Sequence, residues 1–364
     1  MKTNIYTGLQ CDGVFSLSLC VDVSIDDFRV QVDRNVQSNA AEPFPAAYAS
    51  RLGLAQRSDS DRRARCGESI CHGEEALPVA RAQMYTERPI DISNDSDTLG
   101  SVVESQHVVL IHGTGCTGQF WSHVAPEFQR RGYIVHTPSL RHHDLPLKEG
   151  SSKIAGLSLL DYTDDLVKYV DSLNSPPLLV GHSLGGLLAQ LVAARTNHAG
   201  VIAAAPAPAA GIFATYPAMI RMWAPHFIHP RPWARPLNPK WSHMRWGAQH
   251  QTEDHLRELF DMMVCESGRA YCEMSLFFLD RHRAAKVDFD AITSPVLVIG
   301  AGHDRGVNPR IARTTARRHR NATYIEIPNA DHLVFDGEFL PTTMNHIDDW
   351  ITTHDPFGCP TLTA

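Results

Sequence analysis

Residues 178–189 read Leu-Leu-Val-Gly-His-Ser-Leu-Gly-Gly-Leu-Leu-Ala, and this stretch decides the fold. The apolar residues 178–180 predict a buried strand, and residues 184–194 predict a helix. Residues 181–185, where the two meet, fit Gly-x-Ser-x-Gly, a pattern that holds a serine on a tight strand-to-helix turn. Glycines give the turn room, and a helix N-terminus favours negative charge at the serine oxygen. An ordinary glycine-rich turn is the alternative, but the strand–turn–helix setting favours a nucleophile, Ser183.

The sequence on both sides of this stretch continues the same alternation. From about His107 onward, short β-branched runs alternate with longer amphipathic stretches. The runs predict strands over residues 107–111, 133–136, 178–180, 201–205, 295–300 and 323–327. The amphipathic stretches predict helices over residues 120–131, 159–173, 184–194, 309–318 and 340–352. Uniformly apolar strands that alternate with helices indicate an α/β fold, with a parallel sheet covered by helices on both faces.

A serine nucleophile needs a base, and the base needs an acid that orients it. Asp304 and His332 each follow a predicted strand, in loops at the carboxyl ends, where open α/β sheets place their sites. Asp331 is a rival acid, but adjacent side chains tend to point apart, which favours Asp304. A surface histidine is the alternative interpretation of His332. The sequence therefore predicts a catalytic triad of Ser183, His332 and Asp304.

Acyl transfer also needs two backbone N–H groups that hold the oxyanion. Leu184, directly after the serine, is the first expected donor. The second is expected in the loop His112-Gly113-Thr114-Gly115, which follows the first predicted strand, with Thr114 as the donor. A plain glycine turn is the alternative for this loop.

The alternation stops between residues 206 and 285, which we interpret as a cap inserted into a core of residues 101–205 and 286–364. The insertion is rich in proline and contains four of the six tryptophans, and residues 253–280 predict helical structure. Its aromatic and methionine side chains predict either an apolar pocket or packing of the cap onto the core. Candidate substrate contacts are Gly113, Trp121 and Trp223, although packing within a helix is an equally good interpretation of Trp121.

Residues 1–100 show no sustained periodicity of either kind. They contain a charge-rich stretch at residues 57–65 that is typical of a linker. We expect an N-terminal extension of uncertain order, and one hypothesis places the natural start at Met84.

Composition excludes several classes of function. The 364 residues carry a net charge of −7, which does not favour a nucleic-acid partner. No apolar run of about 18 residues predicts a membrane span, and the N-terminus lacks the features of a signal peptide. Eight cysteines form neither a C-x-x-C pair nor a dense disulfide framework, so a reducing cytoplasm is expected. Twenty histidines, including His142 and His143, show no metal-binding motif, so neither a metal nor another cofactor is expected.

Residues 107–352 resemble the α/β-hydrolase superfamily. The resemblance rests on the His112-Gly113 pair, residues 181–185, the loop ending at Asp304, and Asp331-His332. It implies a mostly parallel eight-stranded sheet, an inserted helical cap, no cofactor, and acyl transfer to water through an acyl-enzyme. The chain is most similar to single-chain esterases and lipases with such a cap. The first 80 or so residues match none of the family's opening strands.

Several chemistries of this superfamily stay open. Haloalkane dehalogenases and epoxide hydrolases are disfavoured because they need an aspartate in place of Ser183. Carbon–carbon bond hydrolases, hydroxynitrile lyases and acyltransferases keep the same triad, and a ligand receptor could keep the fold without turnover. The sequence predicts a serine hydrolase whose partners are water and a small apolar or aromatic ester. Oligomeric state is not indicated.

Overall fold

The computed structural model describes residues 106–214 and 216–358. All of these residues lie in one compact unit, Asn94–Ala364. The predictions made for residues 1–100, including a start at Met84, lie outside the described residues.

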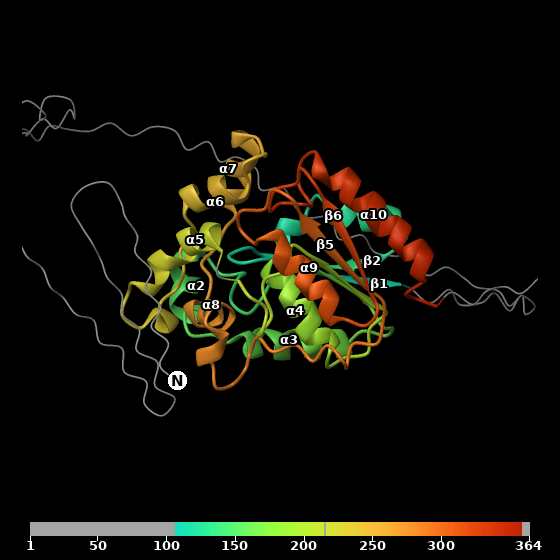
Figure 1. The fold of residues 1–364 in the computed structure, drawn as a ribbon, viewed down its shortest axis with the longest axis horizontal. Helices are drawn as coiled ribbons and strands as arrows, with labels where there is room; N and C mark the ends of the chain where they lie inside the picture. Colours follow the sequence, from blue (N-terminus) through green and yellow to red (C-terminus); the bar gives the residue numbers. More distant parts are fainter. Residues whose placement is uncertain (1–105, 215, 359–364) are drawn as a thin grey trace, which may run out of the picture. The chain divides into compact units, whose positions relative to one another are not determined.

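The described residues contain a six-stranded sheet whose neighbouring strands are all parallel (Figure 1). Its strand order is β2-β1-β3-β4-β5-β6. The strands are β1 (His107–Ile111), β2 (Ile134–His136), β3 (Leu178–His182), β4 (Gly200–Ala204), β5 (Val296–Ala301) and β6 (Ala322–Ile327). The predicted α/β class is confirmed, and each predicted strand is present. Of the eight strands implied by the resemblance, the opening two would precede residue 106 and lie outside the described residues.

The order of the strands fixes where a site forms. The chain passes from β1 to β2 on one side, and later returns to β3 on the other side of β1. Connections from β1 and β3 therefore leave in opposite directions, and a crevice opens at the carboxyl ends of these strands. The central strands β1, β3, β4 and β5 are buried along their whole length, which explains their uniformly apolar sequences.

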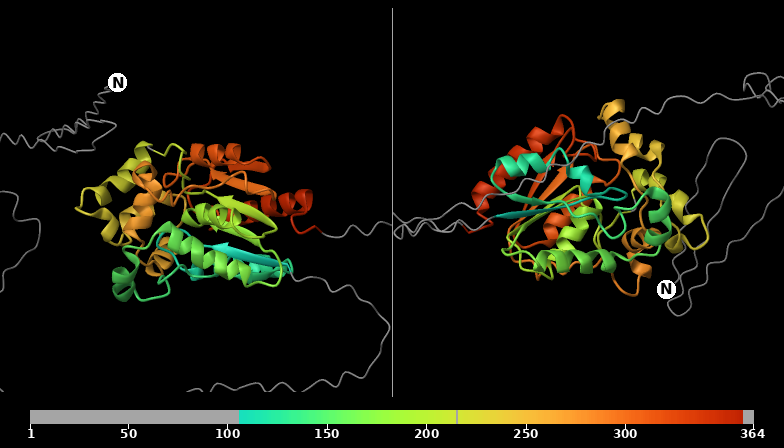
Figure 2. Two further views of the ribbon diagram at one scale, coloured as in Figure 1. Left: turned by 90° about the horizontal axis from the view of Figure 1, so that it is seen from below. Right: turned by 180° about the vertical axis from the view of Figure 1, so that it is seen from behind.

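Helices cover both faces of the sheet, as predicted (Figure 2). One face packs against α3 (Leu159–Asp171), α4 (Leu184–Ala193) and α9 (Pro309–Arg318). The other packs against α1 (Ala125–Arg130) and α10 (Phe339–His354). Each face thus has its own apolar core.

The single helix predicted over residues 120–131 is wrong. A short 3-10 helix, η2 (Gly118–Trp121), ends before α1 begins. Pro126 lies in the first turn of α1, where a missing N–H costs nothing. The same proline would break a continuous helix, because it cannot donate to the preceding turn.

The insertion between β4 and β5, residues 206–285, consists of short helices, and we use the word cap below only as a name for this segment. Another short helix, α2 (Leu147–Ile154), lies earlier in the chain, between β2 and α3. The helices of the insertion are α5 (Pro217–Phe227), η3 (Pro232–Ala234), α6 (Trp241–Gly247), α7 (Glu253–Asp261), α8 (Gly268–Ser275) and η4 (Phe277–Leu279). The helical stretch predicted over residues 253–280 is thus interrupted. Glu266 lies between α7 and α8, where it forms an antiparallel bridge with Leu237. The hydroxyl of the next residue, Ser267, caps α8.

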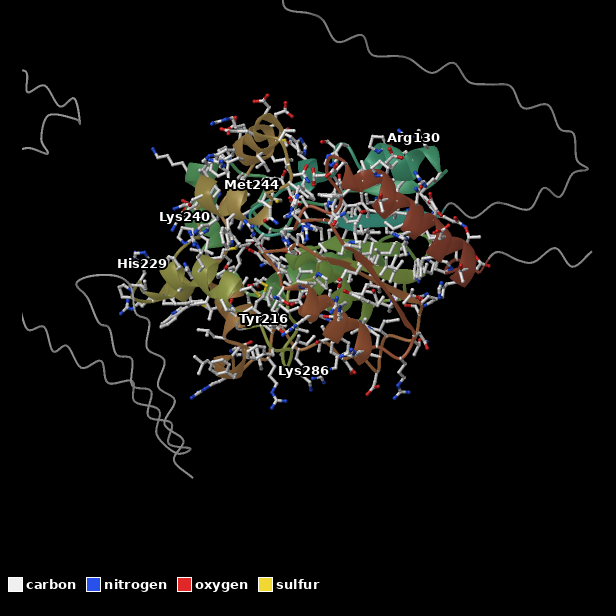
Figure 3. The ribbon with its side chains drawn as sticks, turned by 45° about the horizontal axis from the view of Figure 1, so that its top comes forward. Arg130, Tyr216, His229, Lys240, Met244 and Lys286 are labelled. Carbon is white, nitrogen blue, oxygen red and sulfur yellow. The ribbon has the colours of Figure 1, made fainter. Side chains whose placement is uncertain are left out.

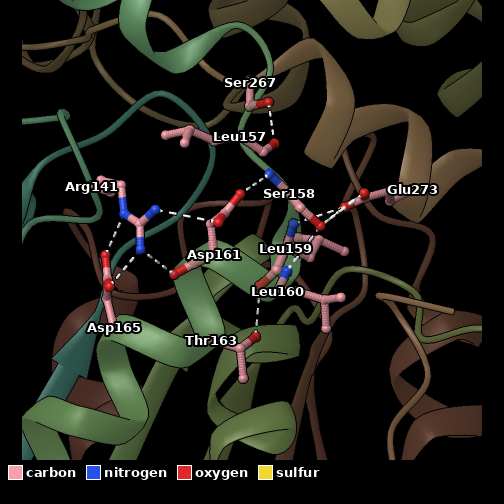
Figure 4. Close-up of polar contacts among 10 residues, drawn as sticks. All are labelled: Arg141, Leu157, Ser158, Leu159, Leu160, Asp161, Thr163, Asp165, Ser267 and Glu273. Carbon is pink, nitrogen blue, oxygen red and sulfur yellow. Dashed lines mark hydrogen bonds and ion pairs between the residues drawn. The ribbon is translucent and has the colours of Figure 1, made fainter. Parts of the chain in front are cut away.

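The insertion is fastened to the core at the N-terminus of α3 (Figure 4). Ser158 caps this helix, and its hydroxyl donates to the Glu273 carboxylate of α8 at 2.8 Å. The Leu159 N–H donates to the same carboxylate, also at 2.8 Å. The Ser267 hydroxyl donates to the Leu157 carbonyl at 2.5 Å. Burial raises the pKa of the Glu273 carboxyl, and the hydrogen bonds from Leu159 and Ser158 partly offset that effect.

Candidate active site

Ser183 stands between β3 and α4 with φ at 56° and ψ at −118°, a strained conformation for a residue with a side chain. The glycines on either side make this turn possible. A Cβ on Gly181 would lie 2.0 Å from the Gly185 carbonyl oxygen, and one on Gly185 would lie 2.0 Å from that of Ile111. The Ser183 N–H donates to Ala204 of the neighbouring strand at 3.0 Å, which holds the turn against the sheet.

The structure brings the three predicted triad residues together. His332 Nε2 lies 3.0 Å from Ser183 Oγ, and His332 Nδ1 lies 2.8 Å from Asp304 Oδ2. The other Asp304 oxygen accepts from the N–H groups of Gly306 and Val307, each at 2.7 Å. With Asp304 accepting from Nδ1, Nε2 is left to accept the serine proton.

The charges around His332 favour its protonated form. Burial disfavours the imidazolium, but the charge and hydrogen bond of Asp304, with the charge of Asp331, outweigh burial and raise the pKa of His332. Asp331 itself makes no contact with the imidazole ring that could orient it. Its carboxylate accepts from the N–H groups of His250 and Leu333 at 2.8 and 3.0 Å. This geometry favours Asp304 over its sequence neighbour as the orienting acid.

The loop after β1 lies directly beside Ser183. A Cβ on Gly113 would be 3.2 Å from the Ser183 Cβ. Thr114 lines the adjoining cavity, and Leu184 is the first residue of α4. In the described part of the chain, the N–H groups of Thr114 and Leu184 have no hydrogen-bond acceptor. No acceptor within the described residues therefore competes for the two N–H groups expected to hold the oxyanion.

A neutral histidine, His112, holds the backbone of this loop. His112 accepts from the Leu140 N–H through Nε2 at 3.0 Å, so its Nδ1–H donates to the Gly113 carbonyl, also at 3.0 Å. Burial and the nearby charge of His143 lower the pKa of His112 to about 3. The ring thus keeps one tautomer across the physiological range.

The cap also contacts this loop, through hydrogen bonds that the sequence did not predict. The Gly115 N–H donates to Glu266 at 3.1 Å, and the Gly115 carbonyl accepts from Val264 at 2.8 Å. Gly115 has φ at 67°, and a Cβ there would lie 2.9 Å from the Val264 carbonyl oxygen. The backbone on both sides of Gly115 is therefore fixed by one cap segment, residues 264–266.

Glu266 is 1% exposed, and its two oxygens have four donors. Besides Gly115, these are the Tyr162 hydroxyl at 2.8 Å, the Ser267 N–H at 2.7 Å and His143 Nε2 at 3.4 Å. Burial opposes ionisation of Glu266, but His143 and the other donors outweigh it and lower the pKa of the carboxyl. The charge of Glu266 in turn overcomes the effect of burial on His143 and raises the pKa of that histidine. No local motif marks Glu266, because three of its four donors, Gly115, Tyr162 and His143, lie more than 100 residues away in the chain.

His182, the residue before Ser183, was also missed by the sequence analysis. Its Nε2–H donates to the His332 carbonyl at 2.7 Å, and its ring stacks on Phe120 at 5.5 Å between centroids. Burial, together with the charge of His332, lowers the pKa of His182 to about 3. A neutral His182 therefore fixes the backbone that carries the base.

A cavity of about 220 Å³ opens at Ser183, between the sheet edge and the cap. Met244 and Lys240, which line it, are labelled in Figure 3. The polar end of the cavity contains Ser183, His332 and Thr114. Most of the remaining wall is apolar and comes from the cap: Met222, Leu237, Met244, Ala248, Leu259, Met263, Val264 and Met274. The arrangement fits a substrate with one reactive polar group and an apolar remainder.

The structure gives a different outcome for each of the three predicted substrate contacts. Gly113 lines the cavity. Trp121 does not: it is fully buried in the core, where its ring meets Phe335 edge to face at 5.1 Å between centroids. Trp223 belongs to α5, but its side chain lies outside what the structure describes. Its neighbour Met222 reaches the cavity.

Residues 108–338 match the model of the alpha/beta hydrolase family, and the chain belongs to that family. Solved structures share the fold. A monoacylglycerol lipase of Paleococcus ferrophilus is 22% identical, with a TM-score of 0.52, over 68% of this chain and 94% of the lipase. The methylesterase MES16 of Arabidopsis is 14% identical, with a TM-score of 0.51, over 68% and 99% of the two chains. A search of curated protein sequences gave no match.

Three further features bear on chemistry. Within residues 106–214 and 216–358, no three His, Cys, Asp or Glu side chains are grouped so that they could hold a metal ion. None of the helices in these ranges has the length and apolar character needed to cross a membrane.

Cys116 lines the cavity, but burial and the charges of Asp336 and Glu266 raise the pKa of its thiol to about 12. Cys116 is therefore protonated and does not compete with Ser183 as a nucleophile.

Proposed function

We propose that this member of the hydrolase family is a serine hydrolase that cleaves a carboxylic ester through an acyl-enzyme. The observation that carries the proposal is the chain of contacts from Ser183 Oγ to His332 at 3.0 Å, and from His332 to Asp304 at 2.8 Å. A serine on a strained turn, a base within hydrogen-bond reach and a buried acid behind it define an activated nucleophile.

Acylation follows from this geometry. Ser183 Oγ attacks the ester carbonyl carbon while its proton moves to His332 Nε2. The carbonyl oxygen becomes an oxyanion, which accepts from the N–H groups of Thr114 and Leu184. His332 then gives its proton to the leaving alkoxide as the ester C–O bond breaks, so that an alcohol departs and an acyl-serine remains.

Deacylation repeats these steps with water as the nucleophile. His332 takes a proton from water as the water oxygen attacks the acyl carbon, and returns it to Ser183 Oγ as the acyl–serine bond breaks. The net reaction converts an ester and water into a carboxylic acid and an alcohol. No cofactor enters any step.

The proposed substrate is a small apolar or aromatic ester. The methionines of the cap support this choice, because unbranched thioethers pack against varied apolar groups. A reducing cytoplasm stays the prediction for the compartment. It is supported by the free thiols of Cys116, Cys265 and Cys272 in the described residues.

The test is hydrolysis of p-nitrophenyl esters, from acetyl to long acyl chains, by the wild type and by Ser183→Ala. We expect turnover with an optimum at an apolar acyl group, and a loss on the order of 10⁴-fold or more in the variant. Ser122→Ala, at an exposed serine, is the matched control. A fluorophosphonate should label Ser183 in the wild type and nothing in Ser183→Ala. Labelling of Ser183 without ester turnover would move the assignment to another reaction of the same triad, and turnover retained in Ser183→Ala would refute the nucleophile.

A further inference from the structure

The first half of the cap has an unusual charge composition. Residues 206–252 contain no Asp or Glu, although the whole chain has 40 acidic and 33 basic residues. The same stretch contains five cations: Arg221, Arg231, Arg235, Lys240 and Arg245. A chain with a net charge of −7 therefore carries a purely basic segment.

This segment also exposes large apolar side chains. Ile220 is 43% exposed, Trp233 is 55% exposed and Ile228 is 80% exposed. The exposed positions of α5 are Pro217, Ile220, Arg221 and Ala224, a spacing that places them on one helix face, and Ile228 continues it. From Ile228 to Arg235 every residue except Pro232 is exposed. We call residues 217–235 the α5–η3 segment.

The cations of this segment are free to meet a partner. In the part of the chain that the structure describes, no carboxylate pairs with Arg221, Arg231 or Arg235. Arg221 lies 4.5 Å from the centroid of the Trp246 ring. The other two arginines flank Trp233 at the exposed turn of η3. Figure 3 shows His229, from the same segment, projecting at the outer end of the cap.

We propose that the α5–η3 segment is a docking surface for an anionic lipid bilayer. Ile228 and Trp233 would enter the boundary between headgroups and acyl chains, and the arginines would contact lipid phosphates. Interfacial segments combine these features: apolar and Trp side chains beside Lys or Arg, without acidic residues that an anionic surface would repel. The combination disfavours a nucleic acid as the occupant, because isoleucines exposed beside a phosphate backbone gain nothing from it.

The position of the segment gives the docking a consequence for catalysis. The inner side of α5 contributes Met222 to the cavity wall, and the chain beyond η3 contributes Leu237 and Lys240. A docked cap would thus bring the cavity to the lipid–water interface, where apolar esters concentrate. This consequence rests on the proposed ester hydrolysis, whereas the docking itself does not.

The test is co-sedimentation of the full-length protein with vesicles. We expect binding to phosphatidylcholine vesicles containing about 30% phosphatidylglycerol, weak binding to pure phosphatidylcholine, and loss of binding at high salt. Arg231→Gln with Arg235→Gln should lower the partition coefficient about 25-fold, since each charge near an anionic surface contributes about fivefold. Ile228→Ser with Trp233→Ser should lower it at least about tenfold.

Matched controls separate a specific surface from general charge. Arg310→Gln with Arg317→Gln changes the net charge equally at exposed positions of α9, and Leu160→Ser removes an exposed leucine of α3. These variants should bind like the wild type. Absent vesicle binding, or equal losses in control and segment variants, would overturn the proposal. So would a dimer in analytical ultracentrifugation that Ile228→Ser dissociates, because the segment would then be a contact between copies. Turnover of a short soluble ester should stay within about twofold in every variant, so a failure of docking is distinguishable from a failure of the esterase assignment.

Discussion

The loops at the carboxyl edge of the sheet and the cap above them face one cavity, yet they use charged residues differently. On the sheet edge, Asp304 accepts from the N–H groups of Gly306 and Val307 in its own loop, and Asp331 accepts from Leu333 nearby and from His250 of the cap. In the cap, Glu266 and Glu273 accept from residues of the core, more than 100 positions earlier in the chain. The carboxylate next to His332, that of Asp304, is thus held locally, whereas Glu266 and Glu273 join the cap to the core.

The two halves of the cap also differ from each other in their charged residues. Its second half places buried carboxylates against α3 and against the loop of residues 112–115, which we call the oxyanion loop for its proposed role. Its first half has no carboxylate and presents arginines and apolar side chains outward. The second half therefore holds loops of the core in place, whereas the first half presents its side chains to the exterior. Substitutions that remove the same kind of charge should have effects that depend on the region.

The largest expected effect distinguishes the two neighbouring acids of the sheet edge. Asp304→Asn should lower kcat/KM on the order of 10⁴-fold, because an amide facing Nδ1 disturbs the tautomer of His332. Asp331→Asn is the matched control and should cost less than about tenfold, since that carboxylate contacts only backbone N–H groups near the base. Both rates are measured on one p-nitrophenyl ester. Equal losses in the two variants would contradict the assignment of Asp304.

A smaller effect is expected from the cap carboxylate that holds the oxyanion loop. Glu266→Gln leaves one acceptor oxygen where two serve four donors, so the Gly115 N–H or the Tyr162 hydroxyl loses its partner. Thr114 precedes Gly115, and a displaced oxyanion donor should lower kcat by about 10- to 100-fold with little change in KM. The affinity of a boronic acid, which mimics the tetrahedral intermediate, should fall in parallel with kcat.

Glu273→Gln supplies the control for this prediction. It is the same substitution at a second buried carboxylate in the same half of the cap, but its partners Ser158 and Leu159 lie at α3. It should lower Tm by several degrees while kcat stays within about twofold. If Glu266→Gln gave this same pattern, Glu266 would be structural only, and the cap would have no part in positioning the oxyanion loop.

The sheet edge could be predicted from the sequence because its determinants are local. A strand, a turn residue and a helix start follow one another within a few positions at Ser183, Asp304 and His332, and parallel strands bring their carboxyl ends together. Register adds little uncertainty when each strand is uniformly apolar. The six strands were accordingly predicted within a residue or two of their bounds.

The cap could not be predicted in the same way, because its contacts are long-range. Glu266 and Glu273 are ordinary acidic residues of amphipathic stretches until their distant partners are known. Trp121 shows the same limit: its place in the chain, near the glycine loop, allowed either a pocket residue or a packing residue, and its side chain lies in the core. Local pattern shows where chemistry-bearing loops end, but not which side chains a cavity wall will contain.

The last prediction concerns a small shift in the pH dependence of kcat/KM, and it asks whether the sheet edge or the cap sets the protonation of His332. His332 must be neutral to accept the serine proton, and Asp304 raises the pKa of His332 above its ordinary value of 6.5. kcat/KM should therefore fall about tenfold per pH unit on the acid side of a limb that lies above this value. His112 and His182, whose pKa values lie near 3, stay neutral in this range and add no limb. The residual activity of Asp304→Asn should show its acid limb at lower pH, since the charge that favours the imidazolium is gone, whereas Glu266→Gln should leave the limb in place. A limb that moves with Glu266 rather than with Asp304 would mean that the cap, and not the sheet edge, sets the protonation of the base.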